Sequence, residues 1–202
     1  MKLKNRRCCQ KGTSLIEMMI ASTLGIISIG IIGSIFITGQ KIAKDKSLEL
    51  LLLQSITSTT QIMKEDIQRA GFDGGGGTSV KLSGATNTIH IDSELIGFAY
   101  FHEVSGANKV YSNILYKREG DDLKVCEKKS TQLLTVSNIS PCYFLLDENQ
   151  MKINDFSITQ INLGSEGVSS AMVTIHLGAH LAGDTSLSKS ITAEIKQRNW
   201  WQ

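Results

Sequence analysis

The pattern of hydrophobic and polar positions divides the first third of the chain into two kinds of helix. Residues 15–37 are mostly apolar, and Glu17 is the one charged residue among them; about 23 residues rising about 1.5 Å each span about 35 Å, enough to cross the hydrocarbon layer of a membrane. Residues 40–69 instead repeat apolar side chains mostly at three- and four-residue steps, with charged residues between them, as amphipathic helices do. We therefore predict one long helix, with a transmembrane part over residues 13–39 and an amphipathic part over residues 40–70.

The helical pattern ends at Gly71 and at the four glycines of residues 74–77, because glycine favours the end of a helix over its interior. We interpret residues 74–77 as a flexible connector. Beyond them, short runs rich in β-branched and aromatic residues alternate with turn-like segments such as Gly120-Asp121-Asp122 and Asp184-Thr185. The expected strands are 88–91, 95–104, 109–116, 123–128, 143–146, 153–163, 171–177 and 190–196.

These patterns together predict an α+β fold. The amphipathic half of the helix is expected to pack on an antiparallel sheet within a β-rich head, residues 71–202. Val173, Ile175 and Leu177 alternate with polar residues, as a strand with one buried and one solvated face does.

The charge distribution separates residues 1–12 from the rest of the chain. The formal net charge is +2, with 21 basic and 19 acidic residues. Residues 1–12 hold five of the basic residues and no acid, so the remainder has 16 basic against 19 acidic residues, a net charge of −3. A mildly acidic remainder disfavours a general nucleic-acid-binding role, although Lys124, Lys128 and Lys129 leave room for a local basic patch.

The basic residues also predict an orientation, because lysine and arginine next to a membrane span favour the cytoplasmic side. The N-terminus is then cytoplasmic and the head lies outside. In an oxidising compartment Cys126 and Cys142 can form a disulfide; the bridge would enclose fifteen residues and contribute about 3 kcal/mol in the chain-entropy model. Two free thiols packed in the core are the alternative. Cys8 and Cys9 lie in the basic leader and stay reduced.

The segment Lys11-Gly12-Thr13-Ser14-Leu15-Ile16-Glu17, between the basic leader and the apolar run, resembles the class III signal of type IV prepilins and pseudopilins. The resemblance implies that a prepilin peptidase cuts between Gly12 and Thr13 and methylates the new N-terminus at Thr13. Residues 1–12 are then a leader peptide. The family usually has phenylalanine where this chain has Thr13. An ordinary secretory signal fits less well, because its apolar region takes about 7–15 residues.

Glu17 is a carboxylate at the start of a membrane-length apolar segment, which costs roughly 2.5–3.5 kcal/mol near a bilayer centre and less near the interface. After the implied cut, Glu17 is the fifth mature residue and lies about one helical turn from the new ammonium group at Thr13. Pairing with the ammonium of a neighbouring subunit would offset that cost. We predict that Glu17 sets the register of subunit assembly; the alternative is a solvated carboxylate at the membrane surface.

The segment Asp66-Ile67-Gln68-Arg69-Ala70-Gly71-Phe72 closes the long helix and is similar to the Asp-x-Arg-x-Ala-Gly-aromatic pattern of PilW-like minor pilins, with Arg69 one place later. The resemblances cover about residues 1–72. They imply a pilin-like fold and a minor pilin in a complex that primes type IV pilus polymerisation at the filament tip. The implied partners are prepilin peptidase, other minor and major pilins, and inner-membrane lipid. The implied location is the inner membrane, with one span and a periplasmic head, and then the pilus.

Two other functions stay open: a J-like pseudopilin of a type II secretion system, and a tip adhesin or DNA-uptake module. We expect no catalytic residue, metal or cofactor, and a structural subunit rather than an enzyme. His176 and His180 have a helical metal-ligand spacing, but they lie in strand-like sequence. An N-terminal Thr13 nucleophile is disfavoured at a membrane surface. Trp200 and Trp201 are expected to contact the sheet or another subunit.

Overall fold

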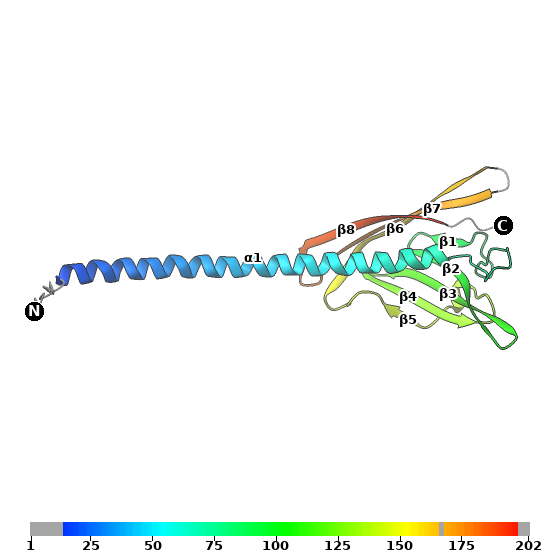
Figure 1. Cartoon of the computed structure of the whole chain (residues 1–202), viewed down its shortest axis with the longest axis horizontal. Coiled ribbons are helices and arrows are strands. Elements are labelled where there is room, and N and C mark those ends of the chain that lie inside the picture. Colours follow the sequence, from blue (N-terminus) through cyan, green and yellow to red (C-terminus); the bar gives the residue numbers. More distant parts are fainter. Residues whose placement is uncertain (1–13, 166–167, 198–202) are drawn as a thin grey trace, which may run out of the picture. The chain divides into compact units, whose positions relative to one another are not determined.

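The computed structural model describes residues 14–165 and 168–197, with side chains except those of residues 163–170 (Figure 1). A single helix, α1 (Leu15–Arg69), runs through the predicted helical region. The chain forms two compact units that divide between Ser47 and Leu48, and each is described by itself. The predicted α+β class is confirmed by the one long helix and the antiparallel strands that follow it.

The first unit contains the part of α1 from Leu15 to Ser47. By length and composition, α1 can cross a membrane, and its most apolar 18-residue window has no buried residue. Hydroxyl side chains in this part donate to backbone carbonyls one turn earlier, as Ser28 Oγ does to Leu24 O at 2.8 Å and Thr38 Oγ1 to Ser34 O at 2.9 Å. These polar groups are therefore satisfied within the helix, as an apolar environment requires.

The second unit holds two antiparallel sheets where the sequence predicts one. The first has the strand order β1-β2-β3-β4-β5 and the second has the order β6-β7-β8. A short 3₁₀ turn, η1 (Val136–Asn138), precedes β5. The strands are β1 (Ile89–Asp92), β2 (Leu95–Ser105), β3 (Asn108–Glu119), β4 (Asp122–Ser130), β5 (Cys142–Phe144), β6 (Met151–Ser165), β7 (Val168–Leu181) and β8 (Asp184–Lys196).

Of the two predicted turns, one is found and one is displaced. Gly120 adopts a φ of 65° between β3 and β4, a conformation that glycine takes without strain. The segment Asp184-Thr185 is not a turn but the start of β8, because Leu181 pairs directly with Asp184 and the chain reverses at residues 182–183.

The main core lies between the second part of α1 and both sheets. One face of the helix supplies Leu52, Ile56, Met63 and Ile67, all 0% exposed. These positions follow the three- and four-residue steps of the sequence pattern, which brings them to one side of the helix. They pack in one cluster with residues of the first sheet, such as Phe98, and of the second sheet, including Ile153, Val173, Ile175 and Leu177.

A second, smaller core covers the opposite face of the first sheet. It joins Val80 and Leu82 of the segment before β1 with Leu115 of β3 and Ile139 of the segment before β5. Gly97 of β2 faces this core, and a Cβ atom there would lie 2.9 Å from Leu82 Cδ1. Glycine therefore permits the covering segment to approach the sheet closely.

Candidate functional site

At the start of α1, Glu17 accepts a hydrogen bond from a residue of its own chain. Ser14 precedes the first helical residue, and its backbone N–H donates to Glu17 Oε2 at 3.1 Å. A serine followed three residues later by glutamate is the capping-box pattern, in which the glutamate accepts from the residue that caps the helix. The carboxylate also lies in the first turn, where the helix dipole favours negative charge. This contact was not among the predictions, although the Ser14-Leu15-Ile16-Glu17 spacing is that of a capping box.

The predicted processing residues, Gly12 and Thr13, lie outside the described residues, as do Trp200 and Trp201. The cut, the methylation and the role of Glu17 in assembly therefore stay predictions.

The end of α1 is fastened to the first sheet by Asp66. The Tyr116 hydroxyl of β3 donates to Asp66 Oδ2 at 2.6 Å, and Tyr116 is 0% exposed. Arg69 Nη1 lies 3.9 Å from Asp66 Oδ1, and its guanidinium stands 5.7 Å from the centroid of the Tyr100 ring. The motif residues Asp66 and Arg69 thus face two tyrosines on neighbouring strands, β2 and β3, which the sequence pattern did not single out.

Burial determines the protonation behaviour of this pair. Desolvation raises the pKa of the Asp66 carboxyl, and the Tyr116 hydrogen bond and the Arg69 charge oppose this rise without cancelling it. Desolvation also raises the pKa of Tyr116, and the nearby Asp66 charge adds to that rise. Tyr116 therefore stays protonated at neutral pH and acts as the donor.

The residues that follow explain why the motif needs alanine and glycine. Ala70 is 0% exposed, and Gly71 has a φ of 84°, which side-chain-bearing residues rarely adopt. Gly71 N donates to Ala99 O at 2.9 Å, and Phe101 N donates to Phe72 O at 2.6 Å. Strand β1 pairs with β2 only over β2 residues 95–98, so the chain leaving the helix continues along the same edge of β2.

The glycine-rich connector is held in place by Asp73. Its carboxylate accepts from the backbone N–H groups of Gly75 at 3.0 Å and Gly76 at 2.9 Å, and Lys109 Nζ donates to its backbone carbonyl at 2.9 Å. Burial alone would raise the pKa of Asp73, but hydrogen bonds from the Thr78, Gly76 and Gly75 backbone lower it. The glycine pattern suggested flexibility; the hydrogen bonds show an organised turn.

Cys126 and Cys142 are joined by the predicted disulfide. The two residues are direct cross-strand partners on β4 and β5, and Cys126 is 0% exposed. The bridge attaches the three-residue edge strand β5 to the sheet.

His176 and His180, which have the helical metal-ligand spacing, both lie on strand β7. Among the described residues, no group of three or more histidine, cysteine, aspartate or glutamate side chains is arranged to hold a metal ion. His176 Nδ1 lies 2.8 Å from Thr192 Oγ1, and His176 Nε2 lies 3.3 Å from Asp155 Oδ2. This carboxylate–imidazole–hydroxyl order resembles that of hydrolases, but none of the three residues lines the pocket of the head, which Ser83, His90 and Val136 line in part.

A shallow depression of about 390 Å³ lies on the surface of the head. Among the described residues, His90 forms no hydrogen bond with the hydroxyl groups that line this depression. Its lining residues are Ser83, Gly84, Ala85, His90, Thr135, Val136 and Ser137.

The three lysines on β4 do not form one basic patch. Successive side chains alternate between the faces of a strand, so Lys129 faces the opposite side from Lys124 and Lys128. Lys124 Nζ is also paired with Glu119 Oε2 at 2.7 Å and lies 4.8 Å from the centroid of the Phe144 ring. The observation weakens the DNA-uptake interpretation, because a phosphate backbone is bound by clustered, accessible cations.

An apolar N-terminal helix that continues into a head of antiparallel strands defines the architecture of a pilin-like protein. The family model of prepilin peptidase-dependent protein B matches residues 45–197, about three quarters of the chain. The chain belongs to this family, which is related to the type IV pilins.

Among curated proteins, the chain is similar to protein B602L of two isolates of African swine fever virus. The identity in each case is 36% over 77 residues, which is 38% of this chain. The chain spans only 13% of the length of these curated relatives, so the similarity carries no inference about function. No solved structure matches the chain.

Proposed function

We propose that the protein is a minor pilin that is matured by a prepilin peptidase and takes part in type IV pilus assembly. The observation that carries the proposal is the match to a family described as prepilin peptidase-dependent. The matched residues, 45–197, do not include the Lys11–Glu17 signal. The signal and the matched residues are therefore separate parts of the chain, and both support maturation by a prepilin peptidase.

The proposed location is the inner membrane, with the N-terminus in the cytoplasm and the head in the periplasm, followed by the pilus fibre or tip. The apolar first part of α1 supports one membrane span. The basic residues of positions 1–12 support the orientation. The disulfide supports an oxidising compartment for the head.

In the finer proposal, the protein is a PilW-like subunit, structural rather than catalytic, in a minor-pilin complex that primes polymerisation. The Asp66–Phe72 motif supports this assignment because it has a definite structural role. It ends α1 and connects the helix to β2 and β3. A J-like pseudopilin would share the same signal. Deleting the gene separates the two, because a minor pilin is needed for pili and a pseudopilin for secretion.

Glu17 has two compatible roles in this proposal. One carboxylate oxygen accepts from Ser14 N–H, and the negative charge is proposed to pair with the Thr13 ammonium group of a neighbouring subunit. The second role is the one that fixes the register between subunits.

The maturation step is tested by Gly12→Val in cells that contain a prepilin peptidase. The intact mass of the wild-type protein should lack residues 1–12, whereas the variant should keep them, because the peptidase cuts after this glycine. Gly25→Val is the matched control: it makes the same substitution within the apolar run, where an added Cβ meets no atom within 4 Å, and it should be cut normally. Removal of the leader from the Gly12→Val protein would refute the assigned cut.

A further inference from the structure

Strand β8 lies at the end of the second sheet. It contains thirteen residues, Asp184–Lys196, and pairs with β7 on one side. Its other side, which we call the outer edge, pairs with no strand among residues 14–165 and 168–197. Such an edge presents a row of backbone N–H and C=O groups that can pair with another chain. The outer edge of β8 is therefore a candidate binding surface.

The pairing with β7 shows which backbone groups of β8 face the outer edge. Gln197 N donates to Ala171 O at 2.7 Å, and the register with β7 is unbroken from Ser188 to Lys196. Backbone groups along an antiparallel strand alternate between its two sides, so odd-numbered residues of β8 face β7 and even-numbered residues face the outer edge. These even-numbered residues are Ser188, Ser190, Thr192, Glu194 and Lys196.

The other strands at the ends of the sheets are short or partly occupied. β1 and β5 have four and three residues. β6 is longer, but Ile153 N donates to Asp121 O at 2.7 Å and Arg118 Nη2 donates to Ile153 O at 3.4 Å. β8 contains neither proline nor glycine, which interrupt strand pairing. Lysine also protects an edge, but Lys189 in the middle of β8 is paired with Glu49 of α1.

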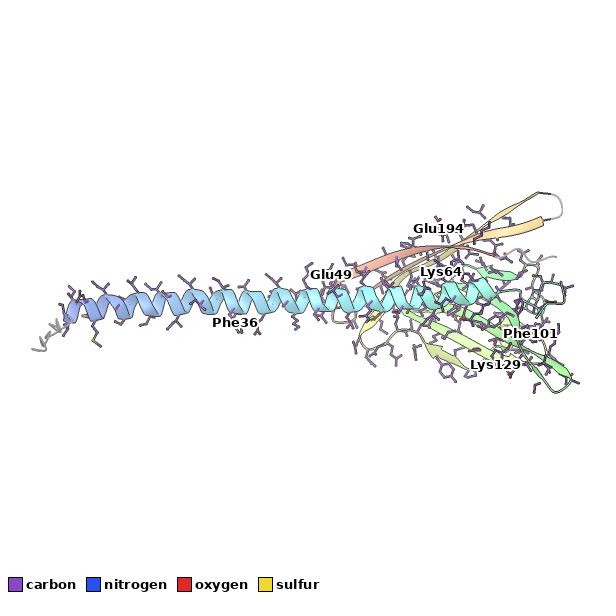
Figure 2. The ribbon with its side chains drawn as sticks, in the orientation of Figure 1. Phe36, Glu49, Lys64, Phe101, Lys129 and Glu194 are labelled. Carbon is purple, nitrogen blue, oxygen red and sulfur yellow. A yellow bond between two sulfur atoms is a disulfide. The ribbon has the colours of Figure 1, made fainter. Side chains whose placement is uncertain are left out.

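The side chains along β8 leave room for a partner strand. The even-numbered residues of β8 are exposed, and those from 186 to 192 are serine or threonine. Figure 2 shows Glu194 on the side of the strand that faces away from α1. Hydroxyl side chains that face each other across two strands stabilise their pairing, and the middle of β8 presents no bulky group on this face.

We propose that β8 pairs antiparallel with β8 of a second copy of this chain, about a two-fold axis at Ser190. Ser188 of each copy then lies opposite Thr192 of the other copy, and two three-stranded sheets join into one continuous sheet. The even-numbered residues of both strands supply the hydrogen bonds. This self-association goes beyond the proposed role in pilus assembly and does not depend on it, because it uses only the edge of the head.

The charges of β8 make the strand complementary to itself. With the axis at Ser190, Asp184 of each copy lies at the same end of the strand pair as Lys196 of the other copy. The register with β7 shifts between Asp184 and Ser188, so this match depends on the long lysine side chain rather than on backbone pairing. Both copies present the same surface at a two-fold interface, so the match is made twice. A second copy therefore satisfies both charged ends, which selects it as the occupant.

The charges also select the position of the axis. With the axis at Glu194, two glutamates lie opposite each other, and like charges destabilise a pair of strands. With the axis at Thr192, Asp184 extends past the end of β8 of the other copy. With the axis at Ser190, Glu194 lies opposite the uncharged Ser186, and the whole of β8 is paired or matched.

Cross-linking at the axis tests the proposal directly, because only a residue on the axis lies opposite itself. The Cα atoms of a hydrogen-bonded antiparallel pair are about 5.5 Å apart, which suits a disulfide. Ser190→Cys should therefore give a disulfide-linked dimer under mild oxidation. Ser188→Cys is the matched control, because its two copies lie four residues apart along the strands, about 14 Å, too far for a disulfide.

The full-length protein is used for this test, with Cys8→Ala and Cys9→Ala so that Cys126 and Cys142, which are joined to each other, are the other cysteines present. It is placed in lipid nanodiscs at one copy per disc, so any link joins two discs. Non-reducing gels should show several-fold more linked dimer for Ser190→Cys than for Ser188→Cys. A yield for Ser190→Cys that does not exceed the control would overturn the proposal.

A proline variant tests the backbone hydrogen bonds of the outer edge. Ser190→Pro removes an N–H that faces this edge and none that faces β7. It should abolish the concentration-dependent pairing of discs seen by mass photometry, while guanidinium unfolding shows that the head stays folded. Ser190→Ala keeps the N–H and should pair as the wild type does. Pairing of the Ser190→Pro protein at the wild-type level would contradict an interface made through this edge.

Discussion

The two parts of α1 share one secondary structure and have opposite surroundings. The first part, up to Ser47, is apolar on all sides over residues 18–37 and contributes no residue to the core of the head. The second part, from Leu48, is more polar, yet it holds all six buried residues of the helix: Leu52, Ile56, Thr59, Thr60, Met63 and Ile67.

The difference shows that the arrangement of apolar residues, rather than their number, decides what a helix packs against. A one-sided apolar stripe is buried by the chain's own sheets, and the polar side faces water. A small head cannot bury every side of a helix that is apolar all round. Lipid or other helices must therefore cover it. We therefore assign the first part of α1 to contacts outside the chain and the second part to the stability of the head.

The strongest test of this division compares the same substitution in both parts. Ile56 is 0% exposed and Ile32 is 66% exposed. Ile56→Ala should lower the free energy of unfolding of the head by about 2–5 kcal/mol, because it leaves a cavity in a packed core. Ile32→Ala should leave that free energy unchanged. Guanidinium unfolding of the full-length protein in nanodiscs measures both, and equal effects would remove the distinction.

The disulfide should have the next largest effect. Replacing Cys126 and Cys142 together by alanine removes the bridge and should cost about 3 kcal/mol in the same unfolding measurement. Replacing Cys8 and Cys9 by alanine is the control and should cost nothing, because these residues precede the predicted cut. Peptide mass mapping without reducing agent should link Cys126 to Cys142, and alkylated thiols at both positions in exported protein would contradict the bridge.

A smaller effect is expected where α1 meets β3. Asp66→Ala should cost about 1–3 kcal/mol, because it leaves the buried Tyr116 hydroxyl without its acceptor. Asp66→Asn keeps a side-chain oxygen in the same place and should cost much less. If the two variants lose the same stability, the hydrogen bond is not what fastens the helix end to the sheet.

The pH dependence of the same carboxyl gives a finer test. Burial holds the pKa of Asp66 above its unfolded value, which is about 3.9. The folded state therefore binds the proton more tightly than the unfolded state. The resulting stabilisation is complete below the unfolded pKa and is lost as pH rises through the higher folded pKa.

Asp66→Asn does not titrate at this position, so its stability relative to the wild type should improve as pH rises from about 4 toward 7. Unfolding free energies of both proteins over this range give the difference. The comparison is needed because Asp73, Glu119 and Asp184 have lowered pKa values and change the overall stability in the opposite sense. A relative stability of the variant that falls with pH would contradict the sign.

The sequence predicted the elements well where local patterns decide them. The expected helix over residues 13–70 begins and ends within two residues of α1, because the apolar pattern and the glycines after it act locally. All eight expected strands are present; most are longer than expected, β7 and β8 by the most residues, and β5 is shorter. Val168–Ser170 and Asp184–Lys189 join these strands through pairing with neighbouring strands, which no local pattern reveals.

Contacts between residues far apart in the sequence could not be predicted from local patterns. The Asp66–Tyr116 hydrogen bond joins residues 50 positions apart, and the division into two sheets depends on which strands pair. By contrast, the disulfide was predictable because only one cysteine pair lies in the head. The contact between Ser14 and Glu17 could also be predicted from the sequence, because the serine and the glutamate have capping-box spacing.

The central claim is that the first part of α1 works between subunits, and Glu17→Gln tests it most directly. Glutamine also completes a capping box, so the variant keeps an acceptor for Ser14 N–H and loses only the charge. In cells that lack the wild-type gene, we expect the variant to be cut, to reach the membrane and to keep a stable head, while surface pili are lost. Wild-type numbers of pili on these cells would show that Glu17 serves only the local cap and would contradict the assembly role.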